Sequence, residues 1–230
     1  MTNYDKTIKF INEFFPNDVN NVKNLLTDIL NDISKFIGGK RVGYQGLDTF
    51  PDFMRPYPSA DFGYFNEDYL GGYFETMRRD LDVKLFPNGP TNFPDINING
   101  INFDFKAVKC PIRKNGKYGA PSYHNAIHAS YNVVDEFKRY FTNNEYSHVI
   151  KSFIIYTYYV EHPNNIHEII GFDIIPTPCT IKTDKNGFAV KHRHGETIQN
   201  ANVCLGYNGI NATETYEECF ERLRNAAFKD

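Results

Sequence analysis

The chain has 230 residues, with 25 Lys and Arg against 28 Asp and Glu, and it contains 20 Phe and 16 Tyr but no Trp. This length is typical of one domain, and the many aromatic residues exclude a disordered chain. The formal net charge of −3 excludes a protein that coats nucleic acid through bulk positive charge, although it is compatible with a locally basic cleft.

The N-terminal part is predicted to be helical. Apolar residues recur at helical spacing over residues 4–15 and 19–37, which predicts two amphipathic helices. Residues 38–63 are rich in Gly and Pro, and we expect an irregular loop there. A third helix is predicted over residues 66–82.

The remaining elements alternate between strands and helices. Period-two alternation predicts a β-hairpin, and β-branched and aromatic runs predict two buried strands. The predicted elements are the hairpin at 93–108, a helix at 123–141, strands at 149–160 and 166–175, polar loop or short hairpins at 180–208, and a helix at 213–228. This order predicts an α/β fold in which a mixed central β-sheet is flanked by helices.

The hairpin sequence FPDININGINFDFK carries the chemically informative residues. Its Asn99-Gly100 pair is the strongest short signal for a two-residue type I′ turn. That turn sets the register, so Asp95 is expected to lie opposite Asp104. Because side chains alternate between the two faces of a strand, both acids share one face with Lys106.

Two acids directly opposite each other repel and destabilise a hairpin. A raised pKa, a basic neighbour or a cation would compensate, and Lys106 lies two residues from Asp104 on the same face. Mg²⁺ is bound in proteins by one or two carboxylates together with waters and substrate phosphate. The alternative is an amphipathic hairpin whose polar face simply lies in water.

The spacing Pro94-Asp95, eight residues, Asp104-Phe105-Lys106 resembles the motif of the PD-(D/E)xK nuclease superfamily. The neighbouring elements agree with this resemblance, since a helix precedes the hairpin and a helix and a strand follow it. Chain length and the helical start look most like type II restriction endonucleases. The resemblance implies a restriction-endonuclease-like core.

The resemblance also implies roles for individual residues. Asp95 and Asp104 would bind Mg²⁺, and Lys106 would position the attacking water. Some members of the superfamily carry a further acid on the preceding helix, for which Glu75 is the best match. The resemblance further implies a homodimer that cuts double-stranded DNA, with a cognate DNA methyltransferase in the host.

Three basic or amide-rich segments are predicted to contact DNA. Residues 106–117 carry five basic residues and no acid, residues 182–194 are also basic, and the glycine-rich loop at 38–46 carries two basic residues and a glutamine. Arg and Lys can read guanine, and Asn and Gln can read adenine. The candidate DNA-binding residues are Lys40, Arg41, Gln45, Lys109, Arg113, Lys114, Lys117, Lys191, Arg193, Asn200 and Asn202.

Four scattered cysteines form no C-x-x-C pair, which favours reduced thiols in a reducing compartment. The first residues lack the apolar core of a signal peptide, and no run of about 18 apolar residues exists. We therefore expect a cytoplasmic protein without a membrane segment.

We predict one nuclease domain over residues 1–230. Its parts are a helical N-terminal region with a DNA-contacting loop (1–82), a catalytic sheet core (83–175), and a recognition loop with a C-terminal helix (176–230). The predicted function is that of a Mg²⁺-dependent type II restriction endonuclease that cuts a specific duplex sequence. Two alternatives remain open: a repair or recombination nuclease of the same superfamily that reads DNA shape, and a non-enzymatic DNA-binding or interaction protein whose hairpin acids are solvated.

Overall fold

The computed structural model describes residues 3–39, 41–43, 62–86, 94–119, 127–128, 132–146, 149–163, 166–191, 202–204 and 213–229. The helices are α1 (Asn3–Phe14), α2 (Val19–Ile37), α3 (Phe62–Met77), α4 (Asn132–Asn143), α5 (Thr177–Thr180) and α7 (Tyr216–Ala227). No helix in the described ranges combines the length and the apolar character needed to cross a membrane.

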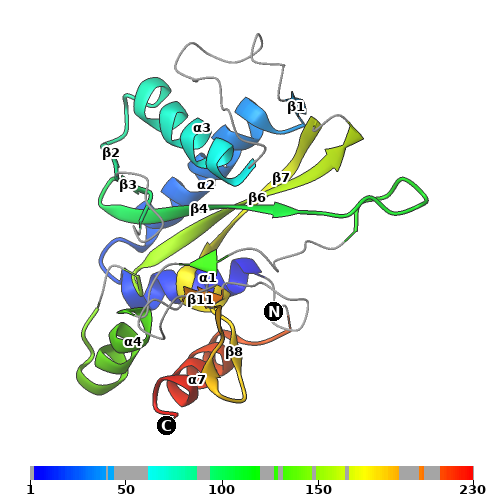
Figure 1. Ribbon diagram of the computed structural model, residues 1–230. Coiled ribbons are helices and arrows are strands. Elements are labelled where there is room, and N and C mark those ends of the chain that lie inside the picture. Colours follow the sequence, from blue (N-terminus) through cyan, green and yellow to red (C-terminus); the bar gives the residue numbers. More distant parts are fainter. Residues whose placement is uncertain are drawn as a thin grey trace.

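The strands are β1 (Arg41–Gly43), β2 (Val83–Leu85), β3 (Ile96–Ile98), β4 (Ile101–Lys109), β5 (Ile127–His128), β6 (Ser152–His162), β7 (Ile166–Pro176), β8 (Thr183–Asp184), β9 (Gly187–Phe188), β10 (Val190–Lys191) and β11 (Asn202–Cys204). Six of them form the central sheet, in the order β1-β7-β6-β4-β3-β2 (Figure 1). β4 runs parallel to β6, and the other neighbours are antiparallel.

This arrangement confirms the predicted mixed central sheet flanked by helices. The sheet nevertheless extends beyond the predicted core of residues 83–175. β1 lies in the segment that was expected to be irregular, and it pairs with the start of β7, where Arg41 lies opposite Glu168. Three residues give too short a hydrophobic pattern to reveal such an edge strand, because its pairing depends on a partner far along the chain.

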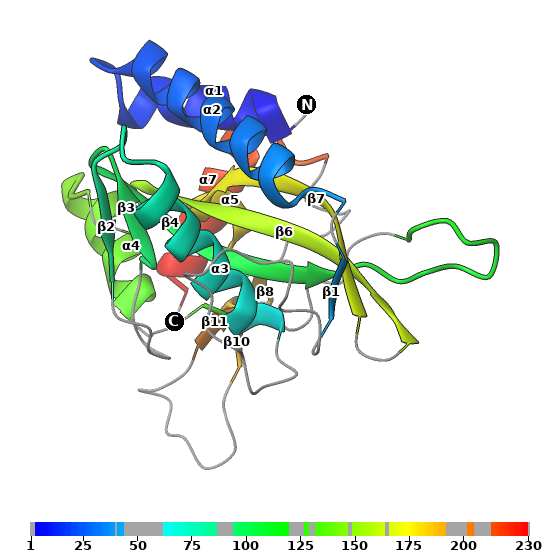
Figure 2. The ribbon, with the colours of Figure 1, turned by 90° about the horizontal axis from the view of Figure 1, so that it is seen from above.

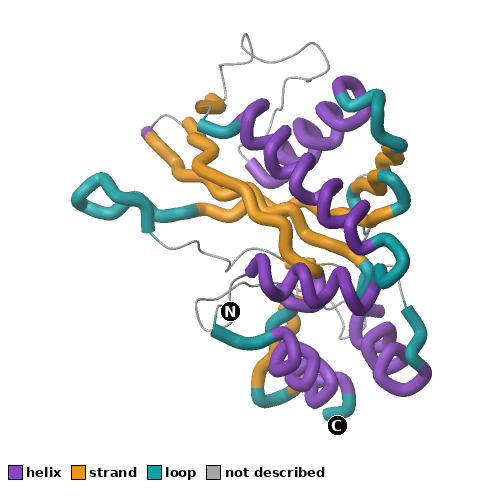
Figure 3. Tube along the Cα trace, turned by 180° about the vertical axis from the view of Figure 1, so that it is seen from behind, coloured by secondary structure: helices purple, strands orange, loops and turns teal. Residues whose placement is uncertain are grey.

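Helices α1 and α2 lie together on one side of the sheet (Figures 2 and 3). The predicted span of α2 is confirmed, and its apolar stripe is buried against the sheet. At the centre of this layer, Phe10 of α1 meets the ring of Phe153 on β6 edge-on at 5.3 Å. Phe153 in turn stacks on Phe103 of β4 at 5.8 Å. These contacts anchor β4 within the apolar core, because all three rings are fully buried.

Helix α3 packs beside β4 and β2 (Figure 1). It begins at Phe62 and ends at Met77, so the predicted span 66–82 is placed too late in the chain. A glycine near its middle permits the close packing, because a Cβ atom on Gly71 would lie 3.3 Å from Leu85 of β2. The ring of Phe74 also stacks on that of Phe105 at 6.5 Å. α3 is therefore held directly against the strand that carries Asp104 and Lys106.

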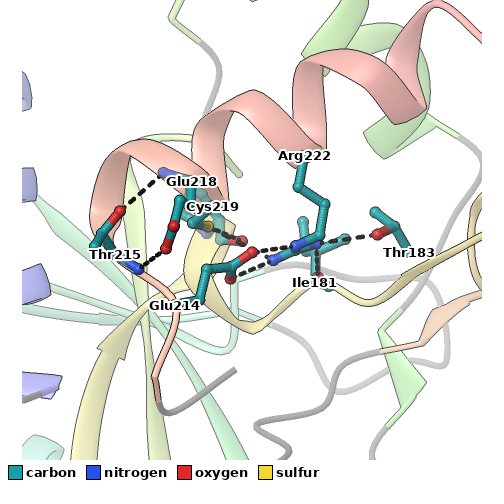
Figure 4. A network of polar contacts seen from close by, with 8 residues as sticks. Ile181, Thr183, Glu214, Thr215, Glu218, Cys219 and Arg222 are labelled. Atoms are coloured by element: carbon teal, nitrogen blue, oxygen red, sulfur yellow. Dashed lines mark hydrogen bonds and ion pairs between the residues drawn. The ribbon is translucent and has the colours of Figure 1, made fainter. Parts of the chain in front are cut away.

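The C-terminal helix α7 begins with a capping box (Figure 4). The Thr215 side chain accepts from the backbone N–H of Glu218 at 3.1 Å, and the Glu218 carboxylate accepts from the backbone N–H of Thr215 at 2.7 Å. Arg222 then joins the helix to the preceding chain through a bidentate contact with Glu214 and a hydrogen bond to the carbonyl of Ile181. These contacts satisfy the first turn of the helix and fix its position beside α5.

The helix predicted over residues 123–141 is wrong at residues 127–128. α4 spans only Asn132–Asn143, and residues 127–128 form strand β5 instead. β5 pairs with β11, with His128 opposite Val203. The apolar spacing in this segment suits a helix locally, but a strand partner about 75 residues later overrides it, which illustrates how tertiary context overrides local preference.

Candidate active site

The β3–β4 hairpin has the predicted turn and register. Both residues of the turn have positive φ, 49° at Asn99 and 81° at Gly100, as a type I′ turn requires. Ile98 lies opposite Ile101, and the pairing continues toward the start of β3. The local sequence NG thus determines which side chains face each other across the hairpin.

Asp95 is held directly beside β4. Its backbone N–H donates to the carbonyl of Phe103 at 3.1 Å, and its Oδ2 accepts from the backbone N–H of Phe105 at 2.7 Å. Lys106 places its Nζ 2.5 Å from Oδ2 of Asp104 and donates to the carbonyl of Phe105 at 3.1 Å. The structure therefore brings Asp95, Asp104 and Lys106 into one cluster.

This cluster is largely removed from solvent. The Asp104 side chain is 1% exposed and that of Lys106 is 16% exposed, while Asp95 is partly exposed. The alternative in which the hairpin acids are merely solvated is therefore wrong. Burying two like charges costs free energy unless opposite charges compensate them. The two acids therefore require a cation beside them.

The electrostatics of the cluster reflect this burial. Burial, and next the charge of Asp104, raise the pKa of Asp95 to about 7, although Lys106 opposes the shift. Burial by itself would lower the pKa of Lys106, but the charges of Asp104 and Asp95 outweigh it and raise that pKa. Lys106 is thus a protonated donor in the metal-free protein, and it compensates the two acids.

Helix α3 brings a further acid, Glu67, near the cluster, and the role expected of Glu75 stays a prediction. Burial raises the pKa of Glu67 to about 8; the charge of Lys106 lowers it, and those of Asp95 and Asp104 raise it. Glu75 is exposed, two turns further along the same helix. Sequence periodicity contains the missed signal, because Glu67 precedes the buried Leu70 by three residues and therefore lies on the apolar side of α3.

We expect Glu67→Gln to reduce metal affinity or cleavage rate by about tenfold to a hundredfold, the usual cost of removing a group that supports a metal ligand set. The matched variant Glu75→Gln on the same helix should behave like the wild type. Cleavage rates measured across a magnesium titration test both variants. Equal effects of the two substitutions would contradict the assignment of Glu67.

The raised pKa of Asp95 predicts how stability depends on pH without metal. Between about pH 4 and 7, the folded protein retains a proton on Asp95 that the unfolded chain has lost. The free energy of unfolding therefore falls as pH rises through this window, on the order of 1–3 kcal/mol for this group. Urea unfolding in EDTA at pH 5 and pH 8 measures the change. Asp95→Asn should flatten the dependence, whereas a profile equally steep in that variant would contradict the assignment.

The donor set of the cluster fits a hard divalent cation. The carboxylate of Asp104 and the carbonyl of Phe105 are oxygen donors that contact the Lys106 ammonium, and the charge of Asp95 acts on the same group. Oδ2 of Asp104 is buried and receives no well-aligned hydrogen bond from the described residues. Those residues contain no group of three or more Asp, Glu, His or Cys side chains placed to hold an ion. The set therefore suits an ion such as Mg²⁺, which retains several waters.

The predicted DNA-contacting residues fall into three groups. Lys40, Gln45, Arg193 and Asn200 lie outside the described residues. Arg41, Lys191 and Asn202 lie on described strands, where Lys191 and Asn202 are paired across β10 and β11, but their side chains are not described. Lys109 at the end of β4, and Arg113, Lys114 and Lys117 after it, are described and exposed. Their role in DNA binding stays a prediction.

A separate cleft of about 800 Å³ lies at the turn end of the hairpin. Its lining includes Asn99, Asn102, Asp28, Arg78 and Lys151. It contains none of the clustered acids, so we place the candidate active site at the buried charge cluster, where pKa values are perturbed by several neighbouring charges.

No family model matches this sequence, and no curated protein is similar to it. Among solved structures, the chain is similar to the NlaIV restriction endonuclease, with a TM-score of 0.46 and 13% sequence identity over 88% of this chain and 83% of that chain. The functional proposal therefore rests on the geometry of this chain and on its sequence motif.

Proposed function

We propose that this protein is a Mg²⁺-dependent endonuclease that hydrolyses phosphodiester bonds at a specific sequence of duplex DNA, in the manner of type II restriction endonucleases. The observation that carries the proposal is the buried pair Asp95 and Asp104 with Lys106 between β3 and β4. Such a pair has no structural benefit by itself, because its repulsion has to be compensated. We further propose a homodimer and a cognate methyltransferase in the host, as the resemblance implies.

Each residue has a defined task in this proposal. Asp95 and Asp104 would hold the ion together with the carbonyl oxygen of Phe105. When bound, Mg²⁺ lowers the pKa of a coordinated water and stabilises the charge that develops on the phosphate. Lys106, as a protonated ammonium, donates a hydrogen bond that orients the attacking water and adds positive charge beside the scissile phosphate. Glu67 lies at the edge of the cluster and, with its pKa raised to about 8, holds a proton near neutral pH without metal; a bound cation would favour its charged form.

Digestion of a plasmid of known sequence tests the proposal. We expect discrete fragments with Mg²⁺ and none with EDTA. A smear, or cutting confined to branched junctions, would favour a nuclease that reads DNA shape. An intact plasmid across a range of divalent ions, DNA sequences and salt concentrations would overturn the proposal of a nuclease.

A further inference from the structure

A two-stranded finger extends directly from the catalytic strand. Residues 110–119, which we call the basic finger, continue β4 beyond Lys109 and extend away from the body of the molecule (Figures 1 and 2). The backbone N–H of Arg113 donates to Lys117 at 2.8 Å, and that of Gly119 donates to Pro111 at 2.7 Å. Gly116 has a φ of 74° in the turn at the tip. The finger therefore has its own hydrogen-bonded hairpin structure.

The charge of the finger is entirely positive. Arg113, Lys114 and Lys117 are exposed, and the sequence from Phe105 to Val134 contains no acidic residue. Within the described part of the chain, these three cations form no ion pair. Lys109 at the base, by contrast, pairs with Glu161 of β6. In a chain of net charge −3, such uncompensated positive charge suits a polyanion.

The base of the finger is tied to the sheet. The backbone N–H of Cys110 donates to the carbonyl of Tyr159 on β6 at 2.7 Å. The Tyr118 hydroxyl donates to Glu168 of β7 at 3.2 Å, and His162 of β6 contacts the same carboxylate at 2.8 Å. These contacts on both sides of the base fix the direction of the finger relative to the cluster at Lys106.

We propose that the basic finger binds phosphates of the DNA duplex to one side of the cut. This inference rests on the proposed function. It gives the distance along the duplex, measured from the cut, at which the protein contacts phosphates. Arg113 lies seven positions after Lys106, and an extended chain of that length spans at most about 25 Å. With a rise of about 3.4 Å per base pair along each strand, the finger reaches phosphates up to about seven base pairs from the scissile one.

The test compares the triple variant R113A/K114A/K117A with the wild type in fluorescence-anisotropy titrations of a DNA duplex in EDTA, at several salt concentrations. Each phosphate contact contributes about 0.9 to the slope of log K against log salt. We expect the slope of the triple variant to be smaller in magnitude by up to about 2.7. The matched control is K35A/K138A/R139A, which removes the same number of exposed cations from α2 and α4 and should leave the slope unchanged.

The outcomes separate this inference from the proposed function. If the wild type and the triple variant have equal slopes, the finger does not bind phosphate, while the nuclease proposal stands or falls by plasmid cleavage. If the slopes differ but no divalent ion supports cleavage, the finger binds DNA and the proposed reaction is wrong. In duplexes whose cut position has been mapped, the DNA on the finger side of the cut can be shortened to fewer than about seven base pairs. This shortening should weaken DNA binding by the wild type and leave binding by the triple variant unchanged. Binding that ignores flank length would overturn the stated position of the contacts.

Discussion

We expect Asp104→Ala to reduce Mg²⁺-dependent DNA cleavage by about a thousandfold or more, which corresponds to roughly 4 kcal/mol of lost transition-state stabilisation. Asp104 is almost completely buried between Asp95 and Lys106, and its Oδ2 lies 2.5 Å from Nζ of Lys106. Its removal therefore deprives the ion of a ligand. Single-turnover cleavage assays, together with Mg²⁺-dependent shifts of the melting temperature, measure both losses.

Two further variants make this experiment decisive. Asp104→Asn preserves the shape of the buried side chain, so a loss of cleavage there reflects the missing charge instead of a cavity. Asp28→Ala removes an exposed carboxylate from α2 and should leave cleavage unchanged. DNA binding in EDTA shows whether each variant is folded. Cleavage by both Asp104 variants within tenfold of the wild type would show that Asp104 is no metal ligand.

The second large effect concerns Lys106. We expect Lys106→Met to reduce cleavage by about a hundredfold to a thousandfold, as the loss of one preorganised donor does in other enzymes. Affinity for Mg²⁺ should be retained or increased, because the ammonium that competes with the ion for Asp104 has been removed. Isothermal titration with Mg²⁺ and single-turnover cleavage separate these two effects.

This combination distinguishes a catalytic lysine from a structural one. In the absence of metal, Lys106→Met should also lower stability, since the two acids lose their compensating charge. Saturating Mg²⁺ should restore most of that stability. Lys138→Met, on the exposed side of α4, serves as the control. If Lys106→Met lost metal binding and activity together while remaining folded, the lysine would serve to maintain the ligand geometry instead of the chemistry.

Features that depend on near neighbours in the chain were predictable. The span of α2 follows from the spacing of its apolar residues, and the register of the β3–β4 hairpin follows from Asn99-Gly100. That register runs to Ile96 opposite Phe103, which brings Asp95 beside the strand that carries Asp104. Each of these inferences needs only local geometry, in which turn conformation and side-chain periodicity determine which residues share a face.

Features that depend on distant partners were not predictable. Strand β5 replaces part of a predicted helix because β11 pairs with it. Glu67 lies near the cluster because the side of α3 that carries it and Phe74 packs toward β4, whereas Glu75 is exposed. Such choices depend on contacts between segments far apart in sequence, which local preference cannot reveal.

The sequence by itself determined that two acids and a lysine share one face of a hairpin whose strands are joined by a type I′ turn. Tertiary structure alone decided that this face is buried, that Glu67 joins it, and that the basic finger extends from the same strand with its base tied to β6 and β7. The physical reason is that alternation along a strand sets which side chains lie together, whereas the packing of α3 and the sheet sets how much water reaches them. Burial converts an ordinary polar face into a cluster with strongly perturbed pKa values.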